Sequence, residues 1–191
     1  FDPIPPPTKP IMPAKLSFKS RKNLRDNEAQ RDAHIAKIGT ALEKKDIVYE
    51  MDDVAVDAVV NASGRDNRIG QVCYDHRLEE LAKNIVKACA DDMVKTAIQQ
   101  AWTGNKIILE LDDDIKETGY HFTKFVEGNL IMTCKSAKLY SNIGQIGDDI
   151  ASAASKASSN PLPLAARQNL KANEAKRDAN LARIAAAVDK K

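Results

Sequence analysis

The segment YHFTKFVEGNLIMTCK, residues 120–135, decides the fold class because it contains two strand-like runs joined by a tight turn. Aromatic and β-branched residues favour strands, and a glycine between two such runs is typical of a β-hairpin. The turn is formed by Glu127–Asn129. The run KIILEL at residues 106–111 predicts a further strand upstream. We therefore expect a three-stranded antiparallel sheet.

The chain upstream of this sheet predicts helices. Apolar residues at helical spacing run from residue 74 to residue 102, with a break at Asp91–Asp92. The stretch DDVAVDAVVNASG, residues 52–64, starts with acidic residues and ends with a glycine, which is typical of a short helix. The run DIVYEM at residues 46–51 is a strand or an extended link. Together these elements predict a small, helix-rich α+β unit over residues 46–157.

The composition excludes some classes of function. Apolar residues make up 43% of the 191 residues, but aromatic residues only 5%, so we expect an aliphatic core. No run approaches the roughly 18 apolar residues that a membrane span requires. The net charge of +2 argues against nucleic acid as the main partner, because phosphate binding requires a broad basic face. Three widely separated cysteines predict neither a metal site nor a disulfide framework.

A proline-rich, basic arm occupies residues 1–20. Its first 13 residues include six prolines, which prevent helix formation and favour an extended chain. Residues 1–25 hold six basic residues and a single acidic one, so the arm suits an acidic protein surface or a peripheral contact with lipid. The partner-binding residues that we predict in the arm are Pro5, Pro6, Pro7 and Lys9.

One segment occurs twice. Residues 21–45 (copy 1) and residues 167–191 (copy 2) match at 14 of 25 positions, and a linker, residues 158–166, precedes copy 2. Each copy predicts an amphipathic surface helix with one narrow apolar stripe, because charged residues occupy its other faces. The stripe of copy 1 is Leu24, Ile35, Ile38 and Leu42, and the stripe of copy 2 is Leu170, Leu181, Ile184 and Val188.

Copy 2 is the main candidate for partner binding. If copy 1 docks in a groove of the α+β unit, copy 2 should fit a groove of the same kind. Within one molecule copy 1 already fills that groove. Docking of copy 2 on a neighbouring chain would form dimers or head-to-tail chains. A different explanation of the repeat is descent or excision from a tandem array. The residues predicted to bind the partner are Leu170, Leu181, Ile184 and Val188.

The repeated helix resembles the tubulin-binding repeats of the stathmin family. The residues that carry the resemblance are NEAQRDAHIAKI (Asn27–Ile38) and ANEAKRDANLARI (Ala172–Ile184). Stathmin helices have a similar run of arginine, acidic, alanine, polar, aliphatic and alanine residues. The resemblance implies tubulin binding. This chain differs from the stathmin family in one respect. Stathmin repeats lie within one long helix, whereas an α+β unit separates the two copies of this chain.

The middle of the chain resembles the short N-terminal region shared by dinoflagellate luciferase and luciferin-binding protein. The similar stretches are DIVYEMDDVAVDA, GYHFTKFVEGNLIMTCK and LYSNIGQIGDDI, starting at residues 46, 119 and 139. This resemblance implies a protist source and a role in association without assigned catalysis. The start at Phe1 is compatible with a plastid protein after leader removal, and a cytoplasmic location is the alternative.

The sequence contains no pattern typical of catalysis. His34, His76 and His121 share no metal-ligand spacing, and LDDDIKE at residues 111–117 lacks the alternating ligands of a calcium loop. NIGQIGDD, residues 142–149, lacks the spacing of phosphate-binding loops. We therefore expect no catalytic residue, no metal site and no cofactor.

The function predicted from these observations is that of a non-enzymatic accessory protein for complex assembly. It would dock onto partner subunits, or onto itself, through the repeated helices and the arm. One alternative is a carrier of a small ligand, lipid or pigment, with a pocket between the strands and the helix at Leu78–Cys89. The other alternative is stathmin-like tubulin binding.

Overall fold

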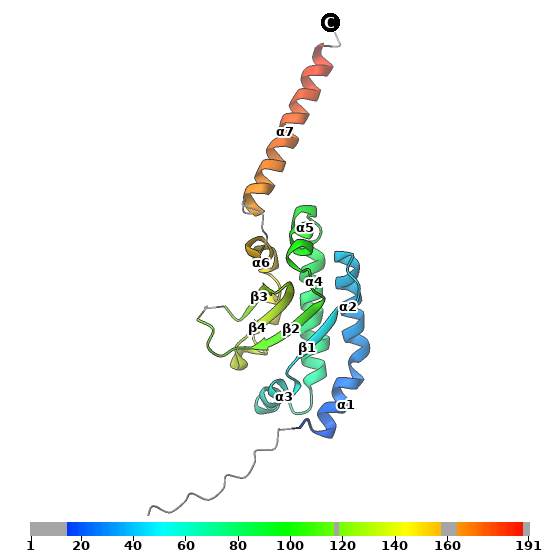
Figure 1. The fold of residues 1–191 in the computed structure, drawn as a ribbon, viewed down its shortest axis with the longest axis vertical. Coiled ribbons are helices and arrows are strands. Elements are labelled where there is room, and N and C mark those ends of the chain that lie inside the picture. Colours follow the sequence, from blue (N-terminus) through cyan, green and yellow to red (C-terminus); the bar gives the residue numbers. More distant parts are fainter. Residues whose placement is uncertain (1–14, 117–118, 158–163, 189–191) are drawn as a thin grey trace, which may run out of the picture.

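The computed structural model describes residues 15–116, 119–157 and 164–188, with side chains in the last range described for residues 168–183. The elements follow one another along the chain as labelled in Figure 1. In order they are α1 (Phe18–Asp26), α2 (Glu28–Leu42), β1 (Val48–Met51), α3 (Asp53–Ala62), the π-helix η1 (Gln71–Arg77), α4 (Leu78–Ala88), α5 (Asp92–Ala101), β2 (Lys106–Leu111), β3 (His121–Val126), β4 (Asn129–Cys134), the 3₁₀ turns η2 (Ser136–Lys138) and η3 (Ile143–Gln145), α6 (Ile150–Ala157) and α7 (Leu164–Val188).

The fold is α+β, as predicted, but the prediction of a three-stranded antiparallel sheet is wrong. The structure has a four-stranded mixed sheet in the order β1-β2-β4-β3. β1, β2 and β4 run parallel, and only β3 and β4 are antiparallel. The hairpin at Glu127 and Gly128 is confirmed because a tight turn leaves a local signal. The parallel pairs join strands that are distant in sequence, and therefore leave no such signal.

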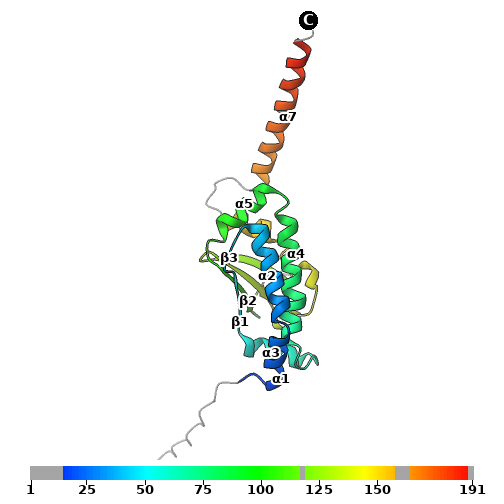
Figure 2. The same cartoon turned by 90° about the vertical axis from the view of Figure 1, so that its right-hand side faces the viewer.

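Helices cover one face of the sheet. Figure 2 shows α2 and α4 on one side of the strands. Successive side chains of each strand therefore point alternately towards these helices and away from them. In β2, Ile107 and Leu109 are buried on the helix side, whereas Ile108 and Glu110 point to the other side and are only partly buried.

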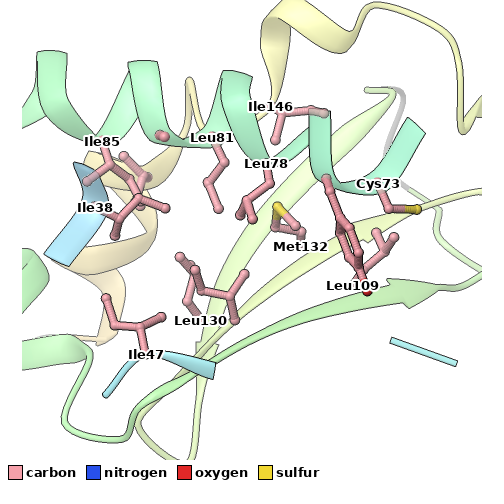
Figure 3. Close-up of a cluster of buried hydrophobic side chains, with 14 of the residues drawn as sticks. Ile38, Ile47, Cys73, Leu78, Leu81, Ile85, Leu109, Leu130, Met132 and Ile146 are labelled. Carbon is pink, nitrogen blue, oxygen red and sulfur yellow. The ribbon is translucent and has the colours of Figure 1, made fainter. Parts of the chain in front are cut away.

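The core lies between α4 and the sheet. Leu78, Leu81 and Ile85 from α4 are fully buried and face Leu130 and Met132 of β4 (Figure 3). Ile38 of α2 enters the same cluster, also fully buried. Copy 1 therefore contributes directly to the core of the α+β unit.

The predicted break between the two long helices is confirmed, and its cause is a helix cap. Asp91 has an extended backbone, and its Oδ1 accepts hydrogen bonds from the N–H groups of Met93 (2.8 Å) and Val94 (3.3 Å). Such a cap satisfies two of the N–H groups that a helix leaves free at its start. Asp52 caps α3 in the same way. Both helices thus begin at the acidic residues that the sequence pattern indicated.

α7 projects away from the α+β unit. Figures 1 and 2 show it from two directions as a straight helix that extends beyond α5 and α6. It contacts both of these helices, and residues 168–175 of α7 lie beside residues 90–93 at the start of α5. The hydrogen bond from Gln168 Nε2 to Asp91 Oδ2 (2.8 Å) fixes this junction.

Candidate docking site

Copy 1 shows how the repeated segment docks. Leu24, Ile38 and Leu42 are buried with 9%, 0% and 2% of their surface exposed, and Ile35 is partly buried beside them. They pack mainly against η1 and α4. The narrow apolar stripe is therefore sufficient to seat the helix on this unit.

Polar contacts fix copy 1 at its start. Asn23 Oδ1 accepts hydrogen bonds from the N–H groups of Gly70 (2.8 Å) and Gln71 (3.3 Å). The guanidinium of Arg31 lies 5.5 Å from the centre of the Tyr74 ring. Both residues recur in copy 2, as Asn169 and Arg177. Copy 2 therefore retains polar side chains that hold copy 1 in place.

The described apolar residues of copy 2 are exposed. Leu170 and Leu181, which correspond to Leu24 and Ile35, are 52% and 56% exposed. The helix also contains the other two predicted stripe residues, Ile184 and Val188, whose side chains lie outside the described set. The predicted arm residues Pro5, Pro6, Pro7 and Lys9 lie outside the described residues as well. The described part of the copy 2 stripe is thus an apolar surface that no other described residue covers.

The two copies differ in backbone as well as in packing. α1 and α2 are separated at Asn27, whereas α7 runs without a break through Asn173. At the other end, a β-carbon on Gly39 would lie 2.7 Å from the carbonyl oxygen of Lys44. Copy 2 has Ala185 at the position of Gly39, so it cannot make the same chain reversal.

The face of the sheet that points away from α2 and α4 is named the outer sheet face. Its side chains form rows across the strands: Val48, Lys106, Asn129 and Val126; then Glu50, Ile108, Ile131 and Lys124; then Glu110, Thr133 and Phe122. Val48 and Val126 at its edges are exposed, whereas Ile131 and Thr133 at its centre are buried. Ion pairs cross this face between Lys106 and Glu50 (2.9 Å) and between Lys124 and Glu110 (2.7 Å). The Lys124 hydrogen bond lowers the pKa of Glu110, which favours its charged form.

A cleft of about 590 Å³ lies at one end of the outer sheet face, where β1 and β2 end and α3 begins. Its apolar lining includes Ile108 and Ile131, and its acidic lining consists of Glu50, Asp52 and Glu110. The sequence pattern gave no indication of this cleft, because it depends on the parallel pairing of β1 and β2. Such crevices at the carboxyl ends of parallel strands are common binding positions.

A buried polar cluster links η1 to the sheet. Arg77 is fully buried, and it donates hydrogen bonds to the carbonyl oxygen of Leu139 (2.8 Å) and to Cys134 Sγ (3.5 Å). No salt bridge to this guanidinium is found among the described residues. The sequence pattern does not reveal this cluster, since Arg77 lies in a predicted amphipathic helix, where an arginine normally faces water.

The chemistry of this cluster favours a structural role. Burial raises the pKa of Cys73 to about 12 and also raises the pKa of Cys134, so both thiols are protonated at neutral pH. A protonated thiol is a poor nucleophile. Among the residues that the structure describes, no group of histidine, cysteine and carboxylate side chains is arranged to hold a metal ion.

His121 makes the stability of this cluster depend on pH. Burial and the nearby charge of Arg77, whose NH2 lies 3.4 Å from His121 Nδ1, lower the pKa of His121 to about 4. The unfolded chain, with a histidine pKa near 6.5, then binds more protons than the folded chain between these values. We expect the free energy of unfolding to decrease as the pH falls from about 6.5 towards about 4.

Urea unfolding at several pH values tests this prediction. His121→Gln should reduce the pH dependence in that window. Burial also lowers the pKa of His34, which should leave some dependence in the His121 variant. Equal pH dependence in wild type and His121→Gln would contradict the assignment to His121.

Within the described ranges, no helix is both long and apolar enough to cross a membrane.

No protein-family model, curated protein or solved structure matches this chain.

Proposed function

We propose that the protein is a non-enzymatic assembly protein, which docks onto partner subunits through the apolar stripe of α7. The observation that carries this proposal is the exposure of Leu170 and Leu181, at 52% and 56%, on a helix whose near-copy is buried in the same chain. An isolated helix gains little stability from its own hydrogen bonds, so a long amphipathic helix normally depends on packing. The stripe of α7 is the surface through which such packing would occur.

We propose another copy of the chain as the partner, because copy 2 repeats a helix that already packs on this fold. Simple exchange of α7 for copy 1 would bury one stripe and expose an equivalent one, including Leu24 and Ile38. Such an exchange therefore gives no net gain in buried apolar area. Association is favourable only if α7 reaches a surface that is open in the folded chain. The proline-rich arm, with Pro5, Pro6, Pro7 and Lys9, remains a second proposed contact.

Hydrogen exchange of the full-length chain tests the role of α7. We expect the amides of residues 168–183 to exchange rapidly at low protein concentration and to become protected at high concentration, when the stripe is covered. Leu170→Asp combined with Leu181→Asp should abolish this protection.

The matched control is Ala179→Asp, since the corresponding Ala33 of copy 1 is exposed. This variant places a negative charge on another face of the helix, and should retain the protection. Protection that is independent of concentration, or that survives the double substitution, would contradict docking through the stripe.

The carrier alternative has a specific observation in its favour, which is the cleft next to Ile108 and Ile131. The position that the sequence predicts for a pocket, between the strands and α4, is filled by Leu78, Leu81 and Ile85, all fully buried. A bound lipid or pigment in protein purified from its native source would support the carrier function. Tubulin binding remains a further proposal, which co-sedimentation with microtubules and with free tubulin would test.

A further inference from the structure

Two charged residues lie between the leucines of the α7 stripe. Leu170, Glu174, Arg177 and Leu181, which we name the contact row, follow one another at spacings of four, three and four residues. These spacings place them within about 60° of one another around the helix. Alternating spacings of three and four residues are typical of helices that pair with other helices. All four side chains are exposed, so the row has a leucine at each end and one acid and one base between them.

The corresponding residues of copy 1 lie on the side of the helix that packs. Leu24 is buried, Ile35 is partly buried against the core, and the guanidinium of Arg31 lies 5.5 Å from the centre of the Tyr74 ring. These residues correspond to the two leucines and the arginine of the contact row. Three of its four positions therefore belong to the contact side of this helix in copy 1.

The contact row points away from the unit to which α7 is attached. Gln168, Ala172 and Ala175 line the groove between α7 and the start of α5. Helical spacing places them on the opposite side of α7 from the row. The helix also extends beyond α5 and α6 in both views (Figures 1 and 2). The contacts that α7 makes with its own chain therefore leave the row accessible.

The contact row is complementary to itself when two copies run antiparallel. Leu170 and Leu181 are equally far from the midpoint between residues 175 and 176, and so are Glu174 and Arg177. An antiparallel pair centred there places each leucine opposite a leucine of the second copy, and each Glu174 opposite an Arg177. A parallel pair in register would instead place Glu174 opposite Glu174 and Arg177 opposite Arg177. Opposite charges stabilise a pairing and like charges disfavour it, so the row favours the antiparallel direction.

The charges of the row are available for this contact. Arg177 donates hydrogen bonds to Asp178 Oδ1 from Nε and NH2, both at 3.1 Å. A guanidinium has five N–H donors, so Arg177 can keep this contact and bind a second carboxylate. The two side chains are 67% and 65% exposed, so their mutual ion pair contributes little. No ion pair of Glu174 is found among the described residues.

We propose that α7 pairs antiparallel with α7 of a second copy of this chain, through the contact row. The inference rests on the proposed function, because it takes α7 as the docking element and names the surface that receives it. The same surface is used on both copies, so the contact closes as a twofold dimer. The α+β units then lie at opposite ends of the helix pair. The leucines supply the apolar contact, and the central charges fix its direction and register.

Full-length charge variants test the pairing. Glu174→Arg makes all four central charges of the dimer positive, and Arg177→Glu makes all four negative. We expect each variant to weaken self-association, measured by sedimentation equilibrium, at least about tenfold. The matched control is Lys176→Glu, because Lys176 is exposed on the side of α7 away from the row and the change in charge equals that of Arg177→Glu. The control should associate like wild type.

A mixture of the two charge variants gives the decisive result. One variant has arginine at both central positions and the other has glutamate, so the mixture restores both opposite-charge contacts and should form a heterodimer. A mixture that stays monomeric overturns the inference.

Leu170→Asp with Leu181→Asp separates the inference from the proposed function. If this variant weakens association and the charge variants associate like wild type, docking through the stripe stands and α7 is not the receiving surface. If wild type does not associate, or if the leucine variant associates like wild type, both the inference and self-assembly through α7 fail.

Discussion

Replacing Leu24 by aspartate is expected to lower the free energy of unfolding by about 3–5 kcal/mol, whereas the same replacement at Leu170 should change it by less than about 0.5 kcal/mol. The two leucines occupy the same position of the repeat, but Leu24 is 9% exposed and Leu170 is 52% exposed. Aspartate at position 24 loses apolar burial and places a carboxylate in the interface between α1 and η1. At position 170 the carboxylate is exposed to water.

Urea unfolding of both variants, monitored at a protein concentration where the chain is monomeric, measures the difference. The comparison is stringent because both helices have nearly the same sequence, so differences in helix propensity largely cancel. A similar loss of stability in both variants would show that α7 is part of the folded core. In that case the stripe of α7 would not be available to a partner.

Gly70→Ala is expected to destabilise the chain by at least about 2 kcal/mol, a large effect for the addition of one methyl group. A β-carbon at Gly70 would lie 2.5 Å from the carbonyl oxygen of Asn23 and 2.9 Å from Leu24 Cα. Both atoms belong to the backbone of α1, so the helix itself must move. This movement also breaks the hydrogen bonds that Asn23 accepts from Gly70 and Gln71.

Gly144→Ala is the matched control for this change. A β-carbon at Gly144 meets no atom within 4 Å, and we expect its effect to stay within about 0.5 kcal/mol. Thermal unfolding of the two variants beside wild type gives the comparison. A Gly70 variant as stable as the Gly144 variant would contradict the close contact between α1 and η1.

Local signals in the sequence predict much of this fold. The hairpin turn at Glu127–Asn129, the break at Asp91–Asp92 and the start of α3 all depend on residues close to one another in the chain. Residues 46–51 were predicted as a strand or an extended link, and β1 lies within them. Its pairing with β2 could not be predicted, because the two strands lie more than 50 residues apart. The pairing of β2 with β4 depends on packing in the same way.

The candidate docking site was likewise predictable only in part. The apolar stripe of copy 2 follows from helical spacing, and the described residues Leu170 and Leu181 are indeed exposed. That copy 1 is the docked copy was only a condition of the prediction, since nearly the same residues form both stripes. The sequence could not predict the burial of Arg77, which depends on Leu139 and Cys134 reaching the guanidinium from distant segments. The outer sheet face likewise depends on the tertiary arrangement of the strands.

Self-assembly through α7 is tested most directly by measuring the molar mass of the full-length chain by light scattering over a wide range of concentrations. We expect a value near the monomer mass of 20.9 kDa at low concentration, and a continuous increase towards the mass of a dimer at high concentration. A mass that stays at 20.9 kDa over the whole range would contradict self-assembly through α7.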